Sequence, residues 1–180
     1  MFVGFLLLQS TTSFNFRVSS YDNSILYFYN SIIFRTRSYE DSEIWLVNST
    51  CSTYNINDQS KVHISWYLDV HVVDSNGIDV PLANVTATYP NATLADSKLT
   101  DANGWARLTL MEKIINATGT YPVGNYTITA EYDTYQEQQS VEMTENKQIV
   151  IPEFPSLIIL PLFMIITLLA VIVYRRKYSL

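Results

Sequence analysis

The two histidines, His63 and His71, are the side chains best suited to bind a metal ion or transfer a proton. Asp69 lies two residues before His71, on the same face of an extended strand and about 7 Å away, so both could touch one ion. Two ligands are fewer than the three or four of a zinc site. His63 lies about 26 Å from His71 along an extended strand, too far to add a ligand. We therefore expect surface histidines on a polar face and no metal site.

Two short segments share the pattern Asp-x-Asn-Gly, Asp74–Gly77 and Asp101–Gly104. Closely spaced oxygen ligands are typical of calcium loops, but neither segment has the further ligands or the closing glutamate of an EF-hand. Asn-Gly supplies the positive φ that a tight hairpin needs. We predict two hairpin turns and no calcium site.

No motif of a familiar active site is present: there is no Gly-x-Ser-x-Gly elbow, no His-Glu-x-x-His and no P-loop. Cys51 is the only cysteine, which excludes an intramolecular disulfide. Glu40, Asp41 and Glu43 fall where we expect a corner between strands, and a solvated edge is their expected role. We predict that the protein is not an enzyme and has no catalytic, cofactor-binding or metal-binding residue.

Aromatic residues in alternating segments offer a different kind of surface. Four side chains are expected on the face opposite Leu26 and Ile44, namely Tyr27, Tyr29, Trp45 and Val47. Stacked strands would gather them into an aromatic patch. Such a patch fits a platform for a sugar, and it fits equally well packing against another part of the protein.

Five Asn-x-Ser/Thr sequons are candidates for glycosylation, at Asn48, Asn84, Asn91, Asn116 and Asn125. Charge excludes another class of partner. All 17 acidic residues lie at or before Glu153, and three of the 11 basic residues lie at 175–177. The part before the tail therefore has eight basic against 17 acidic residues, net −9. This charge gives no basic footprint for nucleic acid.

A repeat with a period of 18 residues positions the candidates in residues 1–66. The segments that align are ILYFYNS (25–31), EIWLVNS (43–49) and KVHISWY (61–67), preceded by Ser24, Ser42 and Ser60 and, within one residue of register, by Asp22, Asp41 and Asp58. Asn30 falls on Asn48 and Tyr21 on Tyr39, which predicts side-chain ladders. One such strand cannot bury its apolar face alone, so the units must stack.

The repeat resembles the rungs of right-handed parallel β-helices, an architecture of many surface and carbohydrate-active proteins and of the β-helix family linked to copper-enzyme maturation. A plain antiparallel sheet is the alternative interpretation. Extended backwards, the register places Leu8 on Leu26 and Arg17 on Arg35. For residues 1–20 we prefer a truncated rung, in a piece of a longer surface protein, to a signal peptide, because the apolar start lacks a preceding basic residue and a small-x-small site.

Residues 67–150 show the signals of a compact sandwich. Alternation from Val62 to Val72 has no break, so the last rung should run directly into the next unit. Strands are predicted at Ala83–Tyr89, Thr93–Thr100, Trp105–Leu110, Asn125–Tyr132, Val141–Thr144 and Gln148–Ile151. Ile114–Tyr121 is expected to be a longer loop. Six or seven short strands in this length indicate a β-sandwich.

The layout of this segment resembles carboxypeptidase-regulatory-like, or transthyretin-like, Ig-like modules. The matching segments are Val72–Gly77, Pro81–Thr86, Thr100–Leu110 and Gly124–Tyr132. The resemblance implies a seven-stranded sandwich that acts as a spacer or adhesion unit on surface proteins, without catalysis of its own.

The C-terminal residues predict a membrane anchor. Residues 157–174 carry no charge and are long enough to cross a bilayer as a helix of about 27 Å. Arg175, Arg176 and Lys177 follow and should stay in the cytoplasm, which places the preceding residues outside the cell. In the linker 151–156, Pro152, Glu153 and Phe154 resemble the PEF-type sorting signals of archaeal surface proteins, which imply cleavage by a membrane transpeptidase. An ordinary single-span anchor is the other interpretation.

Together these features predict an all-β, membrane-anchored surface protein: β-helix-like rungs, an Ig-like sandwich and one C-terminal helix. A structural or adhesive stalk is the favoured function, with membrane lipid and, as further expected partners, surface-layer proteins or polysaccharide. The first alternative is the C-terminal piece of a carbohydrate-binding or carbohydrate-active β-helix. The second is a metal-handling β-helix like those of copper maturation.

Overall fold

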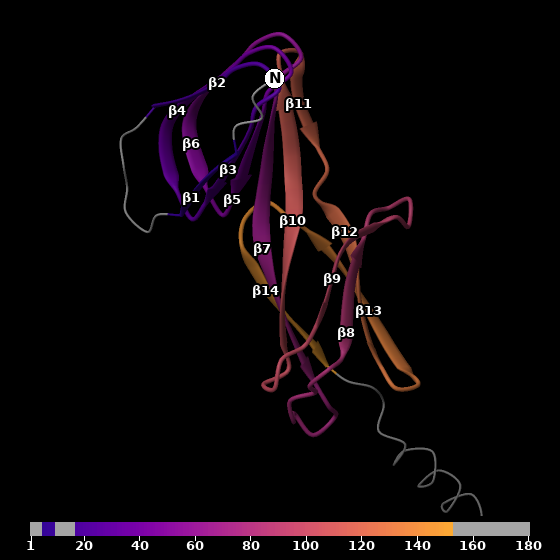
Figure 1. Cartoon of the computed structure of the whole chain (residues 1–180). Coiled ribbons are helices and arrows are strands. Elements are labelled where there is room, and N and C mark those ends of the chain that lie inside the picture. Colours follow the sequence, from indigo (N-terminus) through magenta and orange to yellow (C-terminus); the bar gives the residue numbers. More distant parts are fainter. Residues whose placement is uncertain (1–4, 10–16, 153–180) are drawn as a thin grey trace, which may run out of the picture.

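In residues 5–9 and 17–152, which the computed structural model describes, the chain forms only β-strands and turns (Figure 1). The all-β class expected from the sequence is therefore observed there. The helix predicted at 157–174, the motif residues Glu153 and Phe154, and the basic residues at 175–177 lie outside the described residues.

Two parallel sheets form the N-terminal half, here called the coil stack. The first contains β1 (Phe5–Gln9), β3 (Ile25–Tyr29), β5 (Glu43–Val47) and the start of β7 (Lys61–Val73). The second contains β2 (Arg17–Ser20), β4 (Ile32–Ser38) and β6 (Thr50–Ile56). The chain alternates between the two sheets, so each coil supplies one strand to each.

The predicted period of 18 residues is the observed register. Leu26 pairs with Ile44, and Ile44 with Val62. The corners repeat as well, because left-handed backbone recurs at Asp22, Glu40 and Asp58. Asp and Asn accept this conformation more readily than most residues. In the middle coil the residue in exact register with Asp22 and Asp58 is Glu40, one residue before Asp41, which agrees with the predicted alignment to within one residue.

The backward extension of the register is only partly right. Arg17 pairs with Arg35, as predicted. Leu6, not Leu8, is the partner of Leu26, because β1 pairs with β3 at an offset of 20 residues. The two additional residues therefore lie between the end of β1 at Gln9 and the start of β2 at Arg17.

Apolar and hydroxyl side chains fill the space between the two sheets. The buried apolar residues are Val18, Leu26, Phe28, Ile33, Ile44, Leu46, Val62 and Ile64. Buried serines complete the interior: the hydroxyls of Ser20 and Ser42 lie 2.9 Å apart, and Ser60 donates to Ser38 at 3.0 Å. Two serines of the repeat, Ser42 and Ser60, thus share hydrogen bonds with serines of the other sheet, whereas Ser24 Oγ is buried without a partner among the described residues.

The two long strands β7 and β10 (Trp105–Asn116) run through both halves of the molecule (Figure 1). They pair antiparallel from His71 with Trp105 to Lys61 with Asn116. The first part of β7 belongs to the coil stack, and the second part pairs with β14 (Lys147–Pro152). The uninterrupted strand predicted across position 66 is therefore present.

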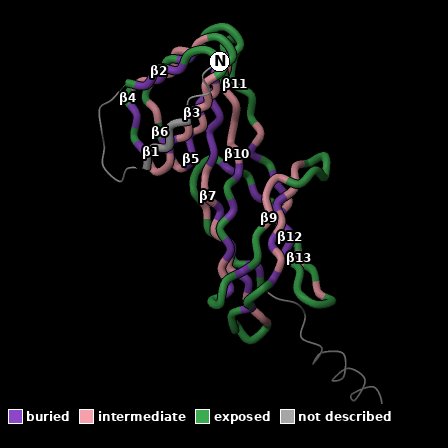
Figure 2. The backbone as a smooth tube through the Cα atoms, in the orientation of Figure 1, coloured by how far each residue is buried: buried purple, intermediate pink, exposed green. Residues whose placement is uncertain are grey.

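A four-stranded antiparallel sheet packs on the second part of β7 and forms the C-terminal half, here called the sandwich. Its order is β13 (Tyr135–Glu142), β12 (Asn125–Tyr132), β8 (Asn84–Thr88) and β9 (Leu94–Leu99). Facing it are β14, β7 and β10, so seven strands build the sandwich. Figure 2 shows buried segments recurring along β7 from one half into the other.

Two strand predictions for the sandwich were wrong. Ile114–Tyr121 is no loop, because β10 continues to Asn116 and turns into β11 (Gly119–Pro122). This hairpin is stabilised from outside the segment, since the end of β10 pairs with the last coil strand. The strand expected at Val141–Thr144 is the end of the longer β13, whose polar residues hide it from a search for apolar alternation.

The sandwich core is continuous with the coil stack through one residue. It contains Leu68, Val70, Val72, Val80, Ala83, Val85, Ala87, Ala106, Leu108, Leu110, Tyr126, Ile128, Ala130, Val141, Met143 and Ile151. Trp66 packs against this cluster and against the coil-stack cluster. The inward-facing positions of β7 therefore pass from one core to the other at Trp66.

The two Asp-x-Asn-Gly turns give a matched test of the fold. Gly77 and Gly104 both have left-handed backbone, with φ of 78° and 73°. A methyl group on Gly77 meets nothing within 4 Å, whereas one on Gly104 lies 2.6 Å from the Val72 carbonyl oxygen. Gly77→Ala should reduce the free energy of unfolding by about 1 kcal/mol, and Gly104→Ala by about 3 kcal/mol. Equal decreases in the free energy of unfolding for the two variants, measured by urea unfolding, would contradict the close packing described around Gly104.

Candidate functional site in the outer faces of the β7 sheet

An aromatic column lies on the outer face of the coil stack. Tyr27, Trp45 and His63 occupy adjacent strands at 18-residue intervals. The rings of Tyr27 and Trp45 stack with centroids 5.8 Å apart, and those of Trp45 and His63 with centroids 3.9 Å apart. Glu43 accepts a hydrogen bond from Trp45 Nε1 at 3.1 Å and lies 3.5 Å from His63 Nε2. The outer face of the coil stack thus presents three stacked rings and the carboxylate of Glu43.

His63 is the clearest correction to the expected site. It was predicted to be a surface histidine, but only 6% of it is exposed. Neither ring nitrogen has a hydrogen-bond partner among the described residues. Burial lowers the pKa of His63 below its ordinary value of 6.5, against the opposing effect of Glu43. Burial therefore favours the neutral form of the imidazole in this column. The spacing of Tyr27, Trp45 and His63 was available in the sequence and is the signal that could have revealed it.

The aromatic patch predicted from Tyr27, Tyr29, Trp45 and Val47 forms only in part. Tyr27 stacks on Trp45 and also lies 6.4 Å, centroid to centroid, from Tyr29. Val47 is buried and adds no exposed surface. Both Tyr27 and Trp45 are half-buried, so the column is more a packed ladder than an open sugar platform.

The polar face of β7 in the sandwich holds its own ion pairs. Arg107 donates to both carboxylate oxygens of Asp69, through Nε at 2.7 Å and through Nη2 at 2.8 Å. This bidentate hydrogen bond raises the pKa of Arg107 further. The guanidinium also lies over the ring of Tyr67, 4.9 Å from its centroid. Asp69 is therefore engaged by a cation of the protein.

His71, the second candidate metal ligand, is engaged in the same way. Its Nε2 lies 2.8 Å from a carboxylate oxygen of Asp79. Its ring stacks on Trp105, with centroids 4.2 Å apart. The structure does not bring Asp69 and His71 together on one ligand, and residues 5–9 and 17–152 contain no group of three His, Cys, Asp or Glu that could hold a metal ion.

The two predicted hairpin turns share one hydrogen-bond pattern. Asp74 Oδ1 accepts from the backbone N–H groups of Asn76 and Ile78, each at 2.8 Å. Asp101 Oδ1 accepts from Asn103 at 2.8 Å and from Trp105 at 3.0 Å. The hydrogen bond from Ile78 lowers the pKa of Asp74. Both carboxylates therefore serve the turns themselves.

Acidic side chains stack at one corner of the coil stack. Glu40 donates its backbone N–H to Asp58 Oδ2 at 3.2 Å. A side-chain hydrogen bond with Asp22, together with the negative charges of Asp22 and Asp58, raises the pKa of Glu40. All three residues are exposed, in agreement with the solvated edge expected for Glu40, Asp41 and Glu43, although Glu43 itself turns towards Trp45.

The predicted asparagine ladder is present and longer than expected. Asn48 Nδ2 donates to Asn30 Oδ1 at 2.6 Å. Asn146, from the turn before β14, donates to Asn48 Oδ1 at 2.6 Å and accepts from the Tyr67 N–H at 2.9 Å. Nothing in the repeat pointed to Asn146, because it comes from the sandwich and lies 98 residues from Asn48. The ladder thus connects the two halves.

The five sequons fall into different surroundings. Asn91 and Asn116 lie at turns, and each accepts hydrogen bonds from the N–H and hydroxyl of its own sequon threonine, Thr93 or Thr118. Asn48 is held in the ladder. Asn84 lies within β8 and accepts from Ser97 Oγ at 3.1 Å. Asn125 is exposed at the first residue of β12.

Pro152, the first residue of the predicted sorting motif, ends β14 and is exposed. None of the elements in residues 5–9 and 17–152 is a helix that could cross a bilayer. The expected anchor at 157–174 lies outside that range.

No family model matches the chain, and no curated protein matches it either. Among solved structures it is similar to the Bacillus anthracis TIE protein (15% identity, TM-score 0.41) over 58% of this chain and 18% of that one. It is also similar to BcpA, the major pilin subunit of Bacillus cereus (12%, 0.36), over 49% of this chain and 29% of that one. A third is Klebsiella pneumoniae 5-hydroxyisourate hydrolase (16%, 0.33), over 49% and 91%. All three TM-scores are below 0.5.

The buried His63 should make the stability of the protein depend on pH. A histidine whose pKa is lowered by folding stabilises the native state above its ordinary pKa of 6.5, and this contribution is lost as the pH falls. As the pH falls below about 6.5, the free energy of unfolding should fall, by no more than about 1.4 kcal/mol per pH unit for one proton. His63→Gln should flatten this slope in urea unfolding of the full chain.

Proposed function

We propose that this protein is a non-enzymatic spacer that displays its coil stack rigidly at the cell surface. The observation that carries the proposal is the continuity of β7 and β10, which are hydrogen-bonded to each other across both halves. Two units joined by a flexible linker move independently as a rule. Here no linker exists, because the same two strands belong to both units.

Side chains at the junction reinforce the shared strands. A β-bulge at Glu112 shifts the register of β10 between Met111 and Lys113. Trp66 Nε1 donates to Glu112 Oε2 at 2.6 Å, and Lys113 pairs with the other carboxylate oxygen at 2.6 Å. Because Trp66 also packs against both cores, bending at the junction would break apolar contacts and a charge-assisted hydrogen bond together.

We also infer that the coil stack is a parallel β-helix of the kind that its sequence resembles. Its support is the alternation of the chain between two parallel sheets at a constant 18-residue register, with repeated corners and side-chain ladders. The carboxypeptidase-regulatory-like sandwich is supported by the seven observed strands.

Rigidity at the junction can be measured by distances between spin labels. In a Cys51→Ser background, Ser52→Cys on β6 and Gln138→Cys on β13 place labels on exposed positions in the two halves. The full chain should give one narrow distance distribution. Trp66→Ala should broaden it and reduce the free energy of unfolding by roughly 2–4 kcal/mol. Glu112→Gln, which keeps the shape of the side chain, should broaden it less.

Trp105→Ala is the control for this experiment, because Trp105 stacks on His71 on the outer face and lies away from the junction. It should leave the distance distribution narrow. A broad distribution in the unaltered chain would show that the two halves move independently and would refute the spacer function.

Surface placement follows from the predicted helix at 157–174, the basic residues after it and the PEF-like residues at 152–154. We propose a single-pass anchor with the described residues outside the cell and the C-terminus in the cytoplasm. Glycans should be attached at Asn91 and Asn116, which lie at turns and use the side-chain oxygen in their hydrogen bonds. Asn48 should remain bare because its amide nitrogen donates to Asn30, and Asn84 because it lies within β8, between the paired strands β12 and β9.

Protease treatment of intact cells tests this placement. Released peptides, identified by mass spectrometry, should come from residues before Pro152 and should carry glycans at Asn91 and Asn116. Lysed cells serve as the control for protected segments. Release of the segment around Arg175 from intact cells, with the Trp105 segment protected, would reverse the topology and refute the proposed display.

A further inference from the structure

Three arginines gather on the outer face of the second parallel sheet. Arg17 on β2 is the register partner of Arg35 on β4, and Arg37 follows two residues further along β4. Neighbouring strands lie about 4.8 Å apart, and alternate residues of one strand about 6.7 Å apart. The three side chains therefore leave the backbone within about 8 Å of one another.

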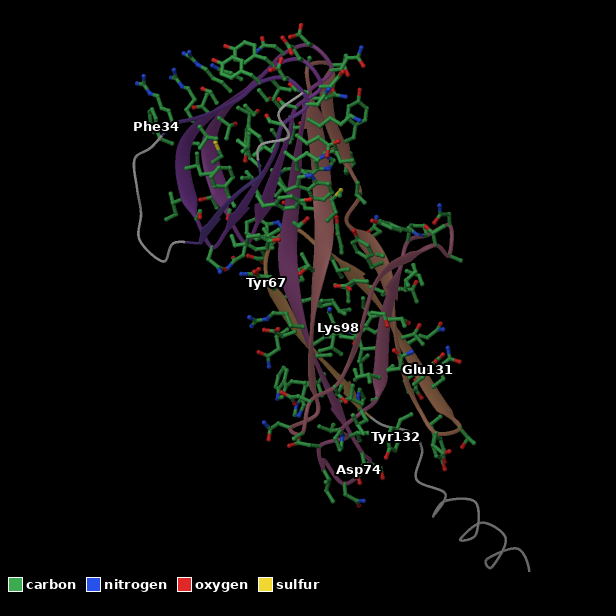
Figure 3. The ribbon with its side chains drawn as sticks, viewed as in Figure 1. Phe34, Tyr67, Asp74, Lys98, Glu131 and Tyr132 are labelled. Atoms are coloured by element: carbon green, nitrogen blue, oxygen red, sulfur yellow. The ribbon has the colours of Figure 1, made fainter. Side chains whose placement is uncertain are left out.

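Apolar side chains are exposed on the same strand. Ile32 is 53% exposed and Phe34 is 39% exposed. Figure 3 shows Phe34 at the outer edge of the coil stack, on the side away from the sandwich. The guanidinium carbon of Arg35 lies 5.8 Å from the centroid of the Phe34 ring, within the range of a cation–π contact. We call the five residues Arg17, Ile32, Phe34, Arg35 and Arg37 the arginine face.

The charges of this face have no partner in the part of the chain that the structure describes. Arg107 and Lys113 each pair with a carboxylate, but none of the three arginines does. The Nε of Arg35 is shielded from water and lacks an acceptor among the described residues. Before Asp22 the sequence contains no acidic residue at all. Like charges held opposite each other on neighbouring strands are destabilising, so the pair of Arg17 and Arg35 carries an energetic cost.

We propose that the arginine face binds an acidic polysaccharide. Each guanidinium can form two parallel hydrogen bonds with a carboxylate or sulfate group. Three arginines that leave the backbone within about 8 Å of one another match a polymer that carries closely spaced anions. Phe34 and Ile32 offer apolar surface to the C–H groups of the sugar rings. The choice of polymer rests on the surface function proposed above, whereas the binding itself is tested on the purified protein.

Two other anionic partners fit this face less well. An anionic membrane is disfavoured by the shape of the molecule. Pro152 ends β14 beside Val73, at the end of β7 remote from the coils (Figure 1), so the proposed anchor would hold the arginine face away from its own membrane. A second copy of the chain offers carboxylates only at the two ends of its exposed β12–β13 face, where Glu131 pairs with Gln136 and Glu142 with Asn125.

The test measures binding of polygalacturonate to the full chain in a nonionic detergent at low ionic strength. Arg17→Gln/Arg37→Gln changes the two exposed arginines, and Lys61→Gln/Lys98→Gln makes the same change of net charge elsewhere. The arginine variant should bind at least about tenfold more weakly, and the lysine control should stay within about twofold of the unaltered chain. Binding should weaken as salt is added, because exposed charges are screened.

Arg17→Lys/Arg37→Lys keeps the charge but loses the planar fork, so its affinity should lie between those of the unaltered chain and the glutamine variant. Circular dichroism and thermal unfolding show that each variant is folded. Equal weakening in the arginine and lysine variants, or equal binding of uncharged dextran, would overturn the proposal.

Two further outcomes would assign the face differently. Competition by soluble dihexanoylphosphatidylglycerol as effective as that by the polymer at equal charge would favour a membrane surface. Self-association in light scattering that the arginine variant abolishes would favour a second copy. Either result would overturn the polysaccharide assignment and leave the spacer function intact, while a flexible junction would refute the spacer function and leave binding measurable.

Discussion

The hydrogen-bonded ladder between β7 and β10 is the constraint on which the rest of the structure depends. Its register fixes which residues of β7 face inward, and these residues belong to the coil stack before Trp66 and to the sandwich after it. A shift of one residue would turn every one of these side chains to the opposite face. The single bulge at Glu112 is placed where the two halves meet, so each half keeps its own regular register.

The same ladder solves a problem of parallel stacks. The last strand of such a stack presents unpaired backbone groups to solvent, which invites pairing with another chain. Here the end of β10 pairs with Lys61–Ile64 of β7, and β11 then covers β10. The Asn30–Asn48–Asn146 ladder continues the stack in side chains at the opposite end of the last coil strand. The β10–β11 hairpin and Asn146 both follow the coil stack in sequence and belong to the strands and turns of the C-terminal half. The C-terminal half therefore stabilises the edge of the coil stack.

The sequence predicted the features that depend on repetition. The 18-residue register, the stacking of Tyr21 on Tyr39 at 4.9 Å and the bond between Asn30 and Asn48 all follow from like residues at one interval. Features created by contacts between the halves were missed. β10 extends past Met111 because its end pairs with the free edge of the last coil strand, the start of β7. β13 forms although its residues are mostly polar. His63 was wrongly predicted to be exposed, because the alternating sequence pattern indicates only which face of the strand it occupies. Its burial comes from the stacked ring of Trp45.

Repetition also explains why the acidic column at the corners and the arginine pair on the second sheet need different explanations. Stacking of identical residues stabilises columns of Asn, Ser and aromatic side chains, which hydrogen-bond or pack with their own kind. In columns of Asp, Glu or Arg, the neighbouring like charges repel each other. Asp22, Glu40 and Asp58 meet this cost at exposed corners, where water screens the charges. For the two aspartates the left-handed backbone is itself a reason to be there. No such reason applies to Arg17 and Arg35, which lie within strands that any β-forming residue could occupy. A repulsion that the fold does not require is best understood as serving a bound anion, and the half-buried Arg35 with its unbonded Nε is where that anion would relieve the greatest cost.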